Sequence, residues 1–241
     1  MLTNNPFFAD LSTYSPEKTI PFYENVFEWN YYKADNYYTA YLNDIEVTGL
    51  YETPEKFKQM RMPHFWMTYI QVANVSETIE IAKHSGGIIE ANQEMKGFGN
   101  MALIRDPNGA GFTVYQGNML KNTRTKSMAN TLIWNELHVS DADNVIPFYQ
   151  SIFDWQITQD RQGIFTVLNH QKEHIADILE IANDYKGKYE YWVCTFGVDS
   201  LQKTKTQILK HGGQLVLDEG HRMLFTDHSH EAFFYIKEVS R

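Results

Sequence analysis

The sequence has a single cysteine, Cys194, and this scarcity limits the chemistry that the chain can carry. One thiol cannot form an intrachain disulfide or a thiolate metal cluster within one chain. Cys194 lies in the apolar run of residues 191–196, so we expect a buried, unreactive thiol rather than a nucleophile.

The chain also lacks a surplus of positive charge and any apolar run long enough to span a membrane. Its 21 basic and 30 acidic residues give a net charge of −9, which disfavours nucleic acid and anionic membrane surfaces as partners. The first ten residues have neither the basic start nor the apolar stretch of a signal peptide. We therefore expect a cytoplasmic protein with no nucleic-acid or membrane partner.

What the sequence contains is a long internal repeat. Residues 20–29 read IPFYENVFEW, and residues 146–155 read IPFYQSIFDW, with six identical positions. Other matches, such as Trp66 with Trp192, keep the same offset, and a hydrophobic fraction of 43% can supply a core to each copy. The repeat predicts one domain at residues 1–118, a linker at 119–129 and a second domain at 130–241.

Each half is predicted to contain two repeats of strand, helix and three strands. In the first half, apolar and β-forming runs predict strands at residues 7–14, 30–35, 37–43, 45–51, 65–73, 88–95, 101–104 and 111–116. Helical spacing follows Pro16, and a capping box at Asn74 and Glu77 begins a helix that ends at His84. In the second half, Asp199 with Gln202 is predicted to cap the corresponding helix.

Two prolines fall inside the repeated helical pattern, at Pro21 and Pro147. A proline is tolerated in the first helical turn, where its missing N–H would have no partner, and otherwise kinks the helix. The sequence leaves both possibilities open.

Three short motifs carry a resemblance to a known family. They are Pro-Phe-Tyr…Phe…Trp after the first strand of each half, His-(Ser)-Gly-Gly after the next helix, and Arg-Asp-Pro-Asn-Gly before the last strand. With the repeated modules, the chain resembles the vicinal-oxygen-chelate superfamily of glyoxalases, bleomycin-resistance proteins and extradiol dioxygenases. The resemblance implies an α+β fold of two tandem glyoxalase-like domains, each a pair of βαβββ modules forming a curved mixed sheet with helices outside. It does not fix the activity, because members isomerise, cleave, oxygenate or only bind.

The resemblance also implies where metal ligands would lie in a metalloenzyme of this family. The matching positions are Phe8, Gly49, Met67 and Thr113 in the first half, and Trp134, Asp177, Val193 and Phe234 in the second. Only Asp177 could bind a divalent cation strongly, and one carboxylate does not hold a metal against water. We therefore expect no metal or other cofactor, with Asp177 as a weak candidate ligand and a divalent metal as the alternative.

Polar residues replace the metal set on the first strand of the second half. Because side chains alternate along a strand, Glu136 and His138 share a face with Trp134, as Asp10 and Ser12 do with Phe8. Glu136, His138 and Asp177 are therefore the candidate catalytic residues. The alternative is a hydrogen-bonded cluster that only satisfies itself.

The cleft predicted from strand alternation is aromatic with a few polar groups, which suits a small organic molecule. The predicted ligand-binding residues are Asp10, Ser12, Tyr69, Thr113, Trp134, Glu136, His138 and Tyr191. Trp66 and Trp192 lie on the opposite strand face and are predicted to belong to the core. His228 and His230 have the spacing of a metal clip, but a solvated turn is the expected role.

Three functions fit these patterns. We predict a small-molecule-binding protein that works through its second half. The alternatives are a lyase, isomerase or dioxygenase type of enzyme that uses Glu136, His138 and Asp177, and a non-catalytic structural or interaction module. The expected state is a monomer with an internal pseudo-dimer, or a homodimer.

Overall fold

A computed structural model describes residues 4–239 and contains strands β1 to β16 and helices α1 to α6. The elements of the first half are β1 (Pro6–Thr13), α1 (Pro16–Phe27), β2 (Asn30–Ala34), β3 (Tyr37–Leu42), β4 (Ile45–Glu52), α2 (Glu55–Gln59), β5 (Phe65–Gln71), α3 (Val75–His84), β6 (Ile88–Met95), β7 (Gly99–Arg105) and β8 (Gly111–Gln116). Those of the second half are β9 (Leu132–Val139), α4 (Ile146–Phe153), β10 (Gln156–Gln159), β11 (Phe165–Leu168), β12 (His174–Glu180), α5 (Asn183–Lys186), β13 (Tyr191–Val198), α6 (Leu201–Lys210), β14 (Gln214–Asp218), β15 (Arg222–Thr226) and β16 (Phe233–Glu238).

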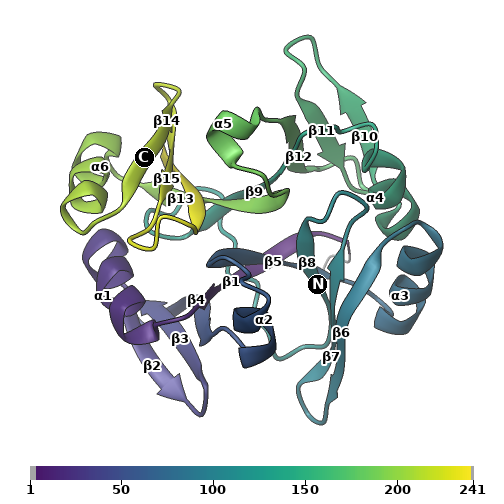
Figure 1. The fold of residues 1–241 in the computed structure, drawn as a ribbon, viewed down its shortest axis with the longest axis horizontal. Helices are drawn as coiled ribbons and strands as arrows, with labels where there is room; N and C mark the ends of the chain where they lie inside the picture. Colours follow the sequence, from purple (N-terminus) through teal and green to yellow (C-terminus); the bar gives the residue numbers. More distant parts are fainter. Residues whose placement is uncertain (1–3, 240–241) are drawn as a thin grey trace. The chain divides into compact units, whose positions relative to one another are not determined.

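The strands form two mixed sheets of eight, and each sheet comes from one half of the sequence (Figure 1). The first has the order β2-β3-β4-β1-β5-β8-β7-β6, and the second repeats it as β10-β11-β12-β9-β13-β16-β15-β14. Within each module the first strand pairs in parallel with the fourth, and the remaining pairs are antiparallel. The predicted α+β fold of paired βαβββ modules is confirmed.

Contact clustering divides the chain into two compact units that differ from the sequence halves. The first, called the middle unit, contains the chain up to Phe8 together with residues 68–122 and 135–193. The second, called the outer unit, contains residues 9–67, residues 123–134 and the chain from Cys194 onward. Each unit therefore takes one module from each half. The boundaries 1–118, 119–129 and 130–241 describe the sequence repeat and stay a prediction.

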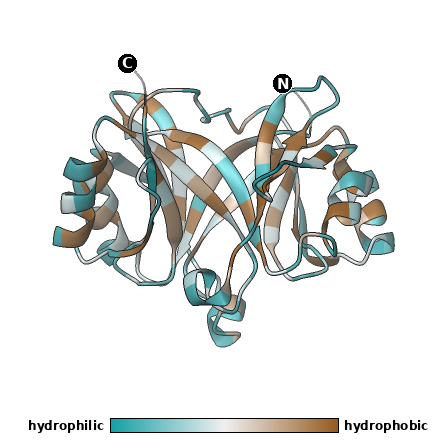
Figure 2. Ribbon diagram, turned by 90° about the horizontal axis from the view of Figure 1, so that it is seen from above, coloured by the Kyte–Doolittle hydropathy of each residue, from teal (hydrophilic) through white to brown (hydrophobic). Residues whose placement is uncertain are grey.

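The helices cover their sheets in pairs that follow these units. Helix α3 lies beside α4 in the middle unit, and α1 lies beside α6 in the outer unit (Figure 1). The apolar faces of these helices pack inward, and burial of Phe22, Phe27 and their neighbours supplies hydrophobic stabilisation. Figure 2 shows hydrophilic residues along the outer sides of the helices. No helix among the described residues is long and apolar enough to span a membrane.

A hydrogen-bonded chain explains why the Pro-Phe-Tyr motif is repeated. In the middle unit, the Trp192 indole donates to the Tyr149 hydroxyl at 3.0 Å, and this hydroxyl donates to Asp106 Oδ2 at 3.0 Å. In the outer unit, Trp66 donates to Tyr23 at 3.1 Å, and Tyr23 lies 3.4 Å from Asp227 Oδ2. In both units the tyrosine of one half meets the aspartate of the other, so the motif joins modules.

The tryptophans of the two hydrogen-bonded Trp-Tyr-Asp chains, Trp66 and Trp192, are buried as predicted, and so is Cys194. The helix N-caps are only partly as predicted. Asn74 accepts a hydrogen bond from the Glu77 N–H, but α6 is capped by Ser200 and not by Asp199. The prediction for Asp199 was wrong by one residue, because both side chains can act as N-caps and only the backbone geometry selects one.

Candidate functional site

The first strand of the second half, β9, carries the polar pair that the sequence analysis singled out. Glu136 and His138 are separated by one residue and therefore point to the same face of the sheet. Glu136 Oε1 lies 2.8 Å from His138 Nε2, and the two side chains are 1% and 0% exposed. A carboxylate and an imidazole in contact, away from bulk water, can bind a polar group or move a proton.

Asp177 lies on the neighbouring strand β12, directly opposite Glu136 in the parallel register. Its Oδ1 atom lies 2.7 Å from Nε2 of His174, which is three residues away on the same strand. The sequence analysis missed His174, because strict alternation along β12 would place it on the opposite face. His174 is 47% exposed and Asp177 is 17% exposed, so this pair forms the open edge of the region.

Tyr191 opens strand β13, which is the next strand after β9 in the sheet. Its ring centroid lies 5.5 Å from that of His138. Burial raises the pKa of the Tyr191 hydroxyl, and the negative charges of Glu136 and Glu190 raise it further. The phenol therefore stays protonated at neutral pH and acts as a neutral hydrogen-bonding group beside the imidazole.

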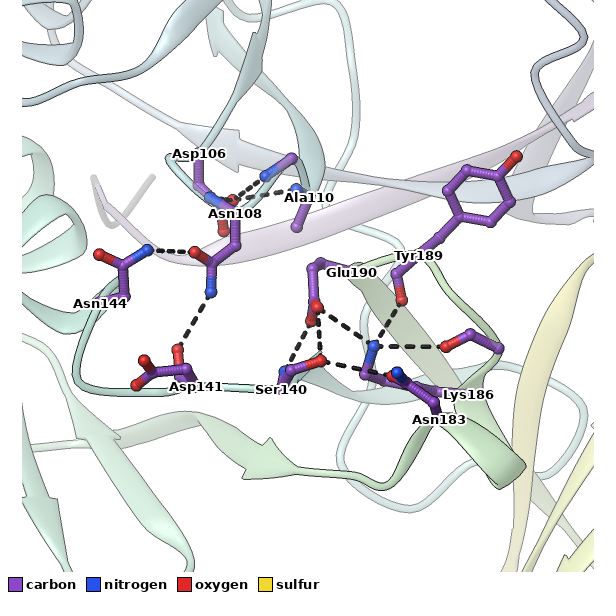
Figure 3. Close-up of polar contacts among 12 residues, drawn as sticks. Asp106, Asn108, Ala110, Ser140, Asp141, Asn144, Asn183, Lys186, Tyr189 and Glu190 are labelled. Atoms are coloured by element: carbon purple, nitrogen blue, oxygen red, sulfur yellow. Dashed lines mark hydrogen bonds and ion pairs between the residues drawn. The ribbon is translucent and has the colours of Figure 1, made fainter.

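A buried ion pair holds the ends of β9 and β13 together (Figure 3). The Lys186 ammonium, at the end of α5, donates to Glu190 Oε1 at 3.1 Å and to the Tyr189 carbonyl at 3.0 Å. Glu190 also accepts hydrogen bonds from the N–H and the hydroxyl of Ser140, both at 2.8 Å. Ser140 follows β9 and Glu190 precedes Tyr191, so this cluster fixes the two strands that carry His138 and Tyr191.

The turn that contains Asp106 forms a second polar centre in the middle unit (Figure 3). Asp106 Oδ1 accepts the N–H groups of Asn108, Gly109 and Ala110 at 2.8–2.9 Å. Burial raises the pKa of the Asp106 carboxyl to about 6, although these hydrogen bonds and the one from Tyr149 oppose the rise. Asp106 has a structural role here, since its hydrogen bonds order the turn backbone and the Trp-Tyr-Asp chain.

The first half carries a different arrangement at the equivalent strands. Asp10, the counterpart of Glu136, accepts a hydrogen bond from the Tyr37 hydroxyl at 3.0 Å. This hydroxyl lies over Gly49, the counterpart of Asp177, and a Cβ atom at Gly49 would come within 1.8 Å of it. Ser12, the counterpart of His138, lies 2.9 Å from the Thr53 hydroxyl. In the first half, the Tyr37 side chain therefore occupies the space above Gly49, where the second half has the Asp177 side chain.

The structure brings some predicted ligand-binding residues together and separates others. Glu136, His138, Asp177 and Tyr191 gather in the middle unit, where Tyr69 and Thr113 are register partners on β5 and β8. Asp10, Ser12 and Trp134 belong to the outer unit. There the Arg124 guanidinium lies 4.5 Å from the Trp134 ring centroid.

The metal positions implied by the family resemblance include one strong donor, Asp177. Within residues 4–239, no group of three or more His, Cys, Asp or Glu side chains is placed to hold a metal ion. His228 and His230 also separate: His228 Nε2 lies 3.0 Å from the Thr19 hydroxyl, and His230 Nε2 lies 3.1 Å from the Gly212 carbonyl.

Two eight-stranded sheets, each built from two βαβββ modules, define the class of fold. The sequence model of the Glyoxalase/Bleomycin resistance protein/Dioxygenase superfamily matches residues 8–114. The first half of the chain thus matches the sequence model of this superfamily, and the second sheet repeats the strand order of the first.

Relatives cover most of the chain at low identity. "Putative glyoxylase CFP32" of Mycobacterium tuberculosis is 26% identical over 226 residues, which are 88% of this chain and 84% of that protein. The anthracycline biosynthesis protein DauV of a Streptomyces species is 22% identical over 160 residues, covering 65% of this chain and 58% of that protein.

Among solved structures, an extradiol ring-cleaving dioxygenase from B. fuscum has a TM-score of 0.65 at 12% identity and covers 98% of this chain and 71% of that chain. At this identity the likeness shows the fold alone.

Proposed function

We propose that the protein binds a small organic molecule through its second half, on the sheet face formed by β9, β12 and the start of β13. The observation that carries the proposal is the Glu136–His138 pair, with its 2.8 Å contact. Burying a carboxylate and an imidazole is costly, and folding alone does not need this pair, since the first half has Asp10 and Ser12 in its place.

The comparison between halves also indicates the kind of ligand. In the first half, the Tyr37 hydroxyl meets the carboxylate of Asp10. Continuing the β11 register by one residue places Ile164 where the first half has Tyr37, so the second half carries an aliphatic side chain in place of this phenol. A ligand with an apolar ring and a hydrogen-bonding group would match Ile164 on one side and the Glu136–His138 pair on the other.

A thermal-shift screen of aromatic and hydroxylated compounds tests this proposal. We expect hits whose stabilisation is lost in His138→Ser, which gives the second half the residue found at Ser12. His84→Ser makes the same change at an exposed helix end and should keep every hit. Hits that survive in the folded His138→Ser protein would disprove binding at this pair.

We also expect the shifts to persist in EDTA, whereas loss in EDTA with recovery on adding Mn²⁺ would indicate a metal site.

The contact between Glu136 and His138 also supports a second candidate function, general acid–base catalysis. A carboxylate that orients an imidazole is a common arrangement for proton abstraction. The test is exchange of a carbon-bound proton of a bound ligand with D₂O, followed by NMR. Catalysis predicts exchange that is lost in Glu136→Gln while binding is kept, and binding without exchange in the wild-type protein would exclude it for that ligand.

A further inference from the structure

A second cluster of titratable groups lies in the outer unit and joins two imidazoles through two hydroxyls. His64 Nδ1 lies 3.1 Å from the Thr13 hydroxyl, which lies 2.7 Å from the Thr19 hydroxyl. Thr19 in turn lies 3.0 Å from His228 Nε2. Thr13, Thr19 and His64 are buried, whereas His228 is partly exposed, so the chain runs from the interior toward solvent.

Counting protons shows that the two imidazoles are coupled. Three hydrogen bonds join the four atoms, and each bond needs one proton. The hydroxyls of Thr13 and Thr19 supply two, so the third must come from either His64 Nδ1 or His228 Nε2. Protons on both nitrogens would leave four protons for three bonds, so one hydroxyl would have to turn its proton out of the cluster, and the directional path between the imidazoles would be interrupted. The Ser15 N–H donates to Thr13 at 3.3 Å and fits either direction of the chain.

The duplicated scaffold provides an internal comparison. The counterparts of Thr13 and Thr19 in the second half are Val139 and Val145, and both are fully buried. The counterpart of His228 is Pro107, and both residues lie directly after the aspartate of the Trp-Tyr-Asp chain. The same fold is therefore built without this polar chain. Buried polar groups are costly unless they form hydrogen bonds. The hydrogen bonds that join the two imidazoles are therefore a special feature of the outer unit.

We propose that Thr13 and Thr19 form a proton relay between His228 and His64. A proton leaves His228 Nε2 for the Thr19 oxygen, the Thr19 proton passes to Thr13, and the Thr13 proton passes to His64 Nδ1. Both hydroxyls are restored, and the net change is the transfer of one proton between the two imidazoles. The reverse direction uses the same bonds, so the relay connects a partly exposed base to a buried one.

The groups around His64 determine which imidazole carries the charge. Burial lowers the pKa of His64, and the nearby His228 lowers it further, whereas Asp227 and Glu231 oppose this change. Glu231 also accepts the His64 backbone N–H at 2.9 Å, and the Tyr14 ring lies 4.9 Å from the imidazole. His64 is thus held neutral, and a proton reaches it through the relay at low pH only.

Histidine-selective ¹⁵N NMR tests the relay, because two-bond ¹H–¹⁵N correlations report which ring nitrogen carries a proton. We expect His64 Nδ1 and His228 Nε2 to have complementary protonation, with each imidazole responding to both titration steps. In Thr19→Val, which copies Val145, the two should titrate as separate single-site curves. Thr13→Val, which copies Val139, should have the same effect.

Thr78→Val is the matched control, because it removes a buried helical hydroxyl that bonds within α3, outside this cluster. Its histidine titrations should equal those of the wild-type protein. The proposal is overturned if both facing nitrogens carry protons in the folded protein at a pH where both imidazoles are neutral. It is also overturned if folded Thr19→Val and Thr13→Val leave both titration curves unchanged.

Discussion

Gly49 and Tyr37 show how a single residue can close one copy of a duplicated site. Glycine at position 49 removes the side chain that Asp177 supplies in the second half, and the Tyr37 hydroxyl takes the space and bonds to Asp10. The two positions depend on each other, because any Cβ at Gly49 would meet the Tyr37 ring and hydroxyl at 1.8–2.9 Å. The first half is thus filled by its own side chain, whereas the second half carries Glu136, His138 and Asp177 at the equivalent strand positions.

Gly49→Ala should therefore lower the free energy of unfolding by about 1–3 kcal/mol, the usual cost of overpacking. Urea denaturation measures the change. In a Tyr37→Ala background the same Gly49→Ala substitution should cost much less, because the clashing ring is gone. Equal costs in both backgrounds would mean that Tyr37 does not occupy the space above Gly49.

The raised pKa of Asp106 predicts how the free energy of unfolding changes with pH. Its folded-state pKa of about 6 lies above the ordinary value of 3.8, so the folded protein holds this proton more tightly than the unfolded chain. The resulting stabilisation is complete below about pH 4 and is lost as the pH rises through about 6. It amounts to at most about 3 kcal/mol, from roughly 1.4 kcal/mol for each unit of pKa. In Asp106→Asn this decrease between pH 4 and 6 should disappear from the unfolding free energies, and an unchanged slope would contradict the raised pKa.

At the scale of elements, the two copies of the Pro-Phe-Tyr helix end alike and begin differently. Helices α1 and α4 both end at a residue in the left-handed region, Glu28 and Asp154. Helix α1 begins at Pro16, which leaves Pro21 inside the helix, whereas α4 begins at Ile146 and places Pro147 in its first turn. Pro147 therefore takes the first-turn position that tolerates a proline, whereas Pro21 lies inside its helix, where a proline is unfavourable.

Pro21→Ala and Pro147→Ala should consequently change stability in opposite directions. Alanine at position 21 restores a helical hydrogen-bond donor and improves helix propensity by up to about 3 kcal/mol, which exceeds the roughly 0.4–1 kcal/mol lost by making the unfolded chain more flexible. Alanine at position 147 brings only that loss, because an N–H in the first turn has no helical partner. Thermal unfolding of the two variants checks the signs, and a stabilised Pro147→Ala protein would contradict this account.

At the scale of the whole molecule, the repeat predicted the fold but not how its modules combine. Residues 20–29 and 146–155 revealed two copies of the family fold, and alternation along β9 placed Glu136 and His138 on one face. The sequence could not show that modules of different halves share a core, because identical motifs could pair within or between halves. Nor could it reveal the Tyr37–Asp10 bond, which depends on how β3 pairs with β4.

Sharing of cores between halves predicts that neither half is stable alone. Each buried core cluster combines residues of both halves, such as Ile70 with Trp192 in one and Phe27 with Phe196 in the other. A chain cut between Lys121 and Asn122, which are exposed and lie outside any helix or strand, would leave two fragments with half of each core facing water. Each Å² of apolar surface exposed in this way costs about 25 cal/mol. Summed over half of each core, this cost exceeds the free energy of unfolding of a small domain.

We therefore expect fragment 1–121 alone to show no cooperative unfolding transition or to self-associate, and fragment 122–241 to behave in the same way. Mixing or co-expressing them should give a 1:1 complex in which the near-UV circular dichroism of the buried tryptophans returns, as size-exclusion chromatography and spectroscopy can measure. If fragment 1–121 is instead monomeric and unfolds cooperatively, each sequence half holds its own core, and the exchange of modules between halves would not be needed for folding.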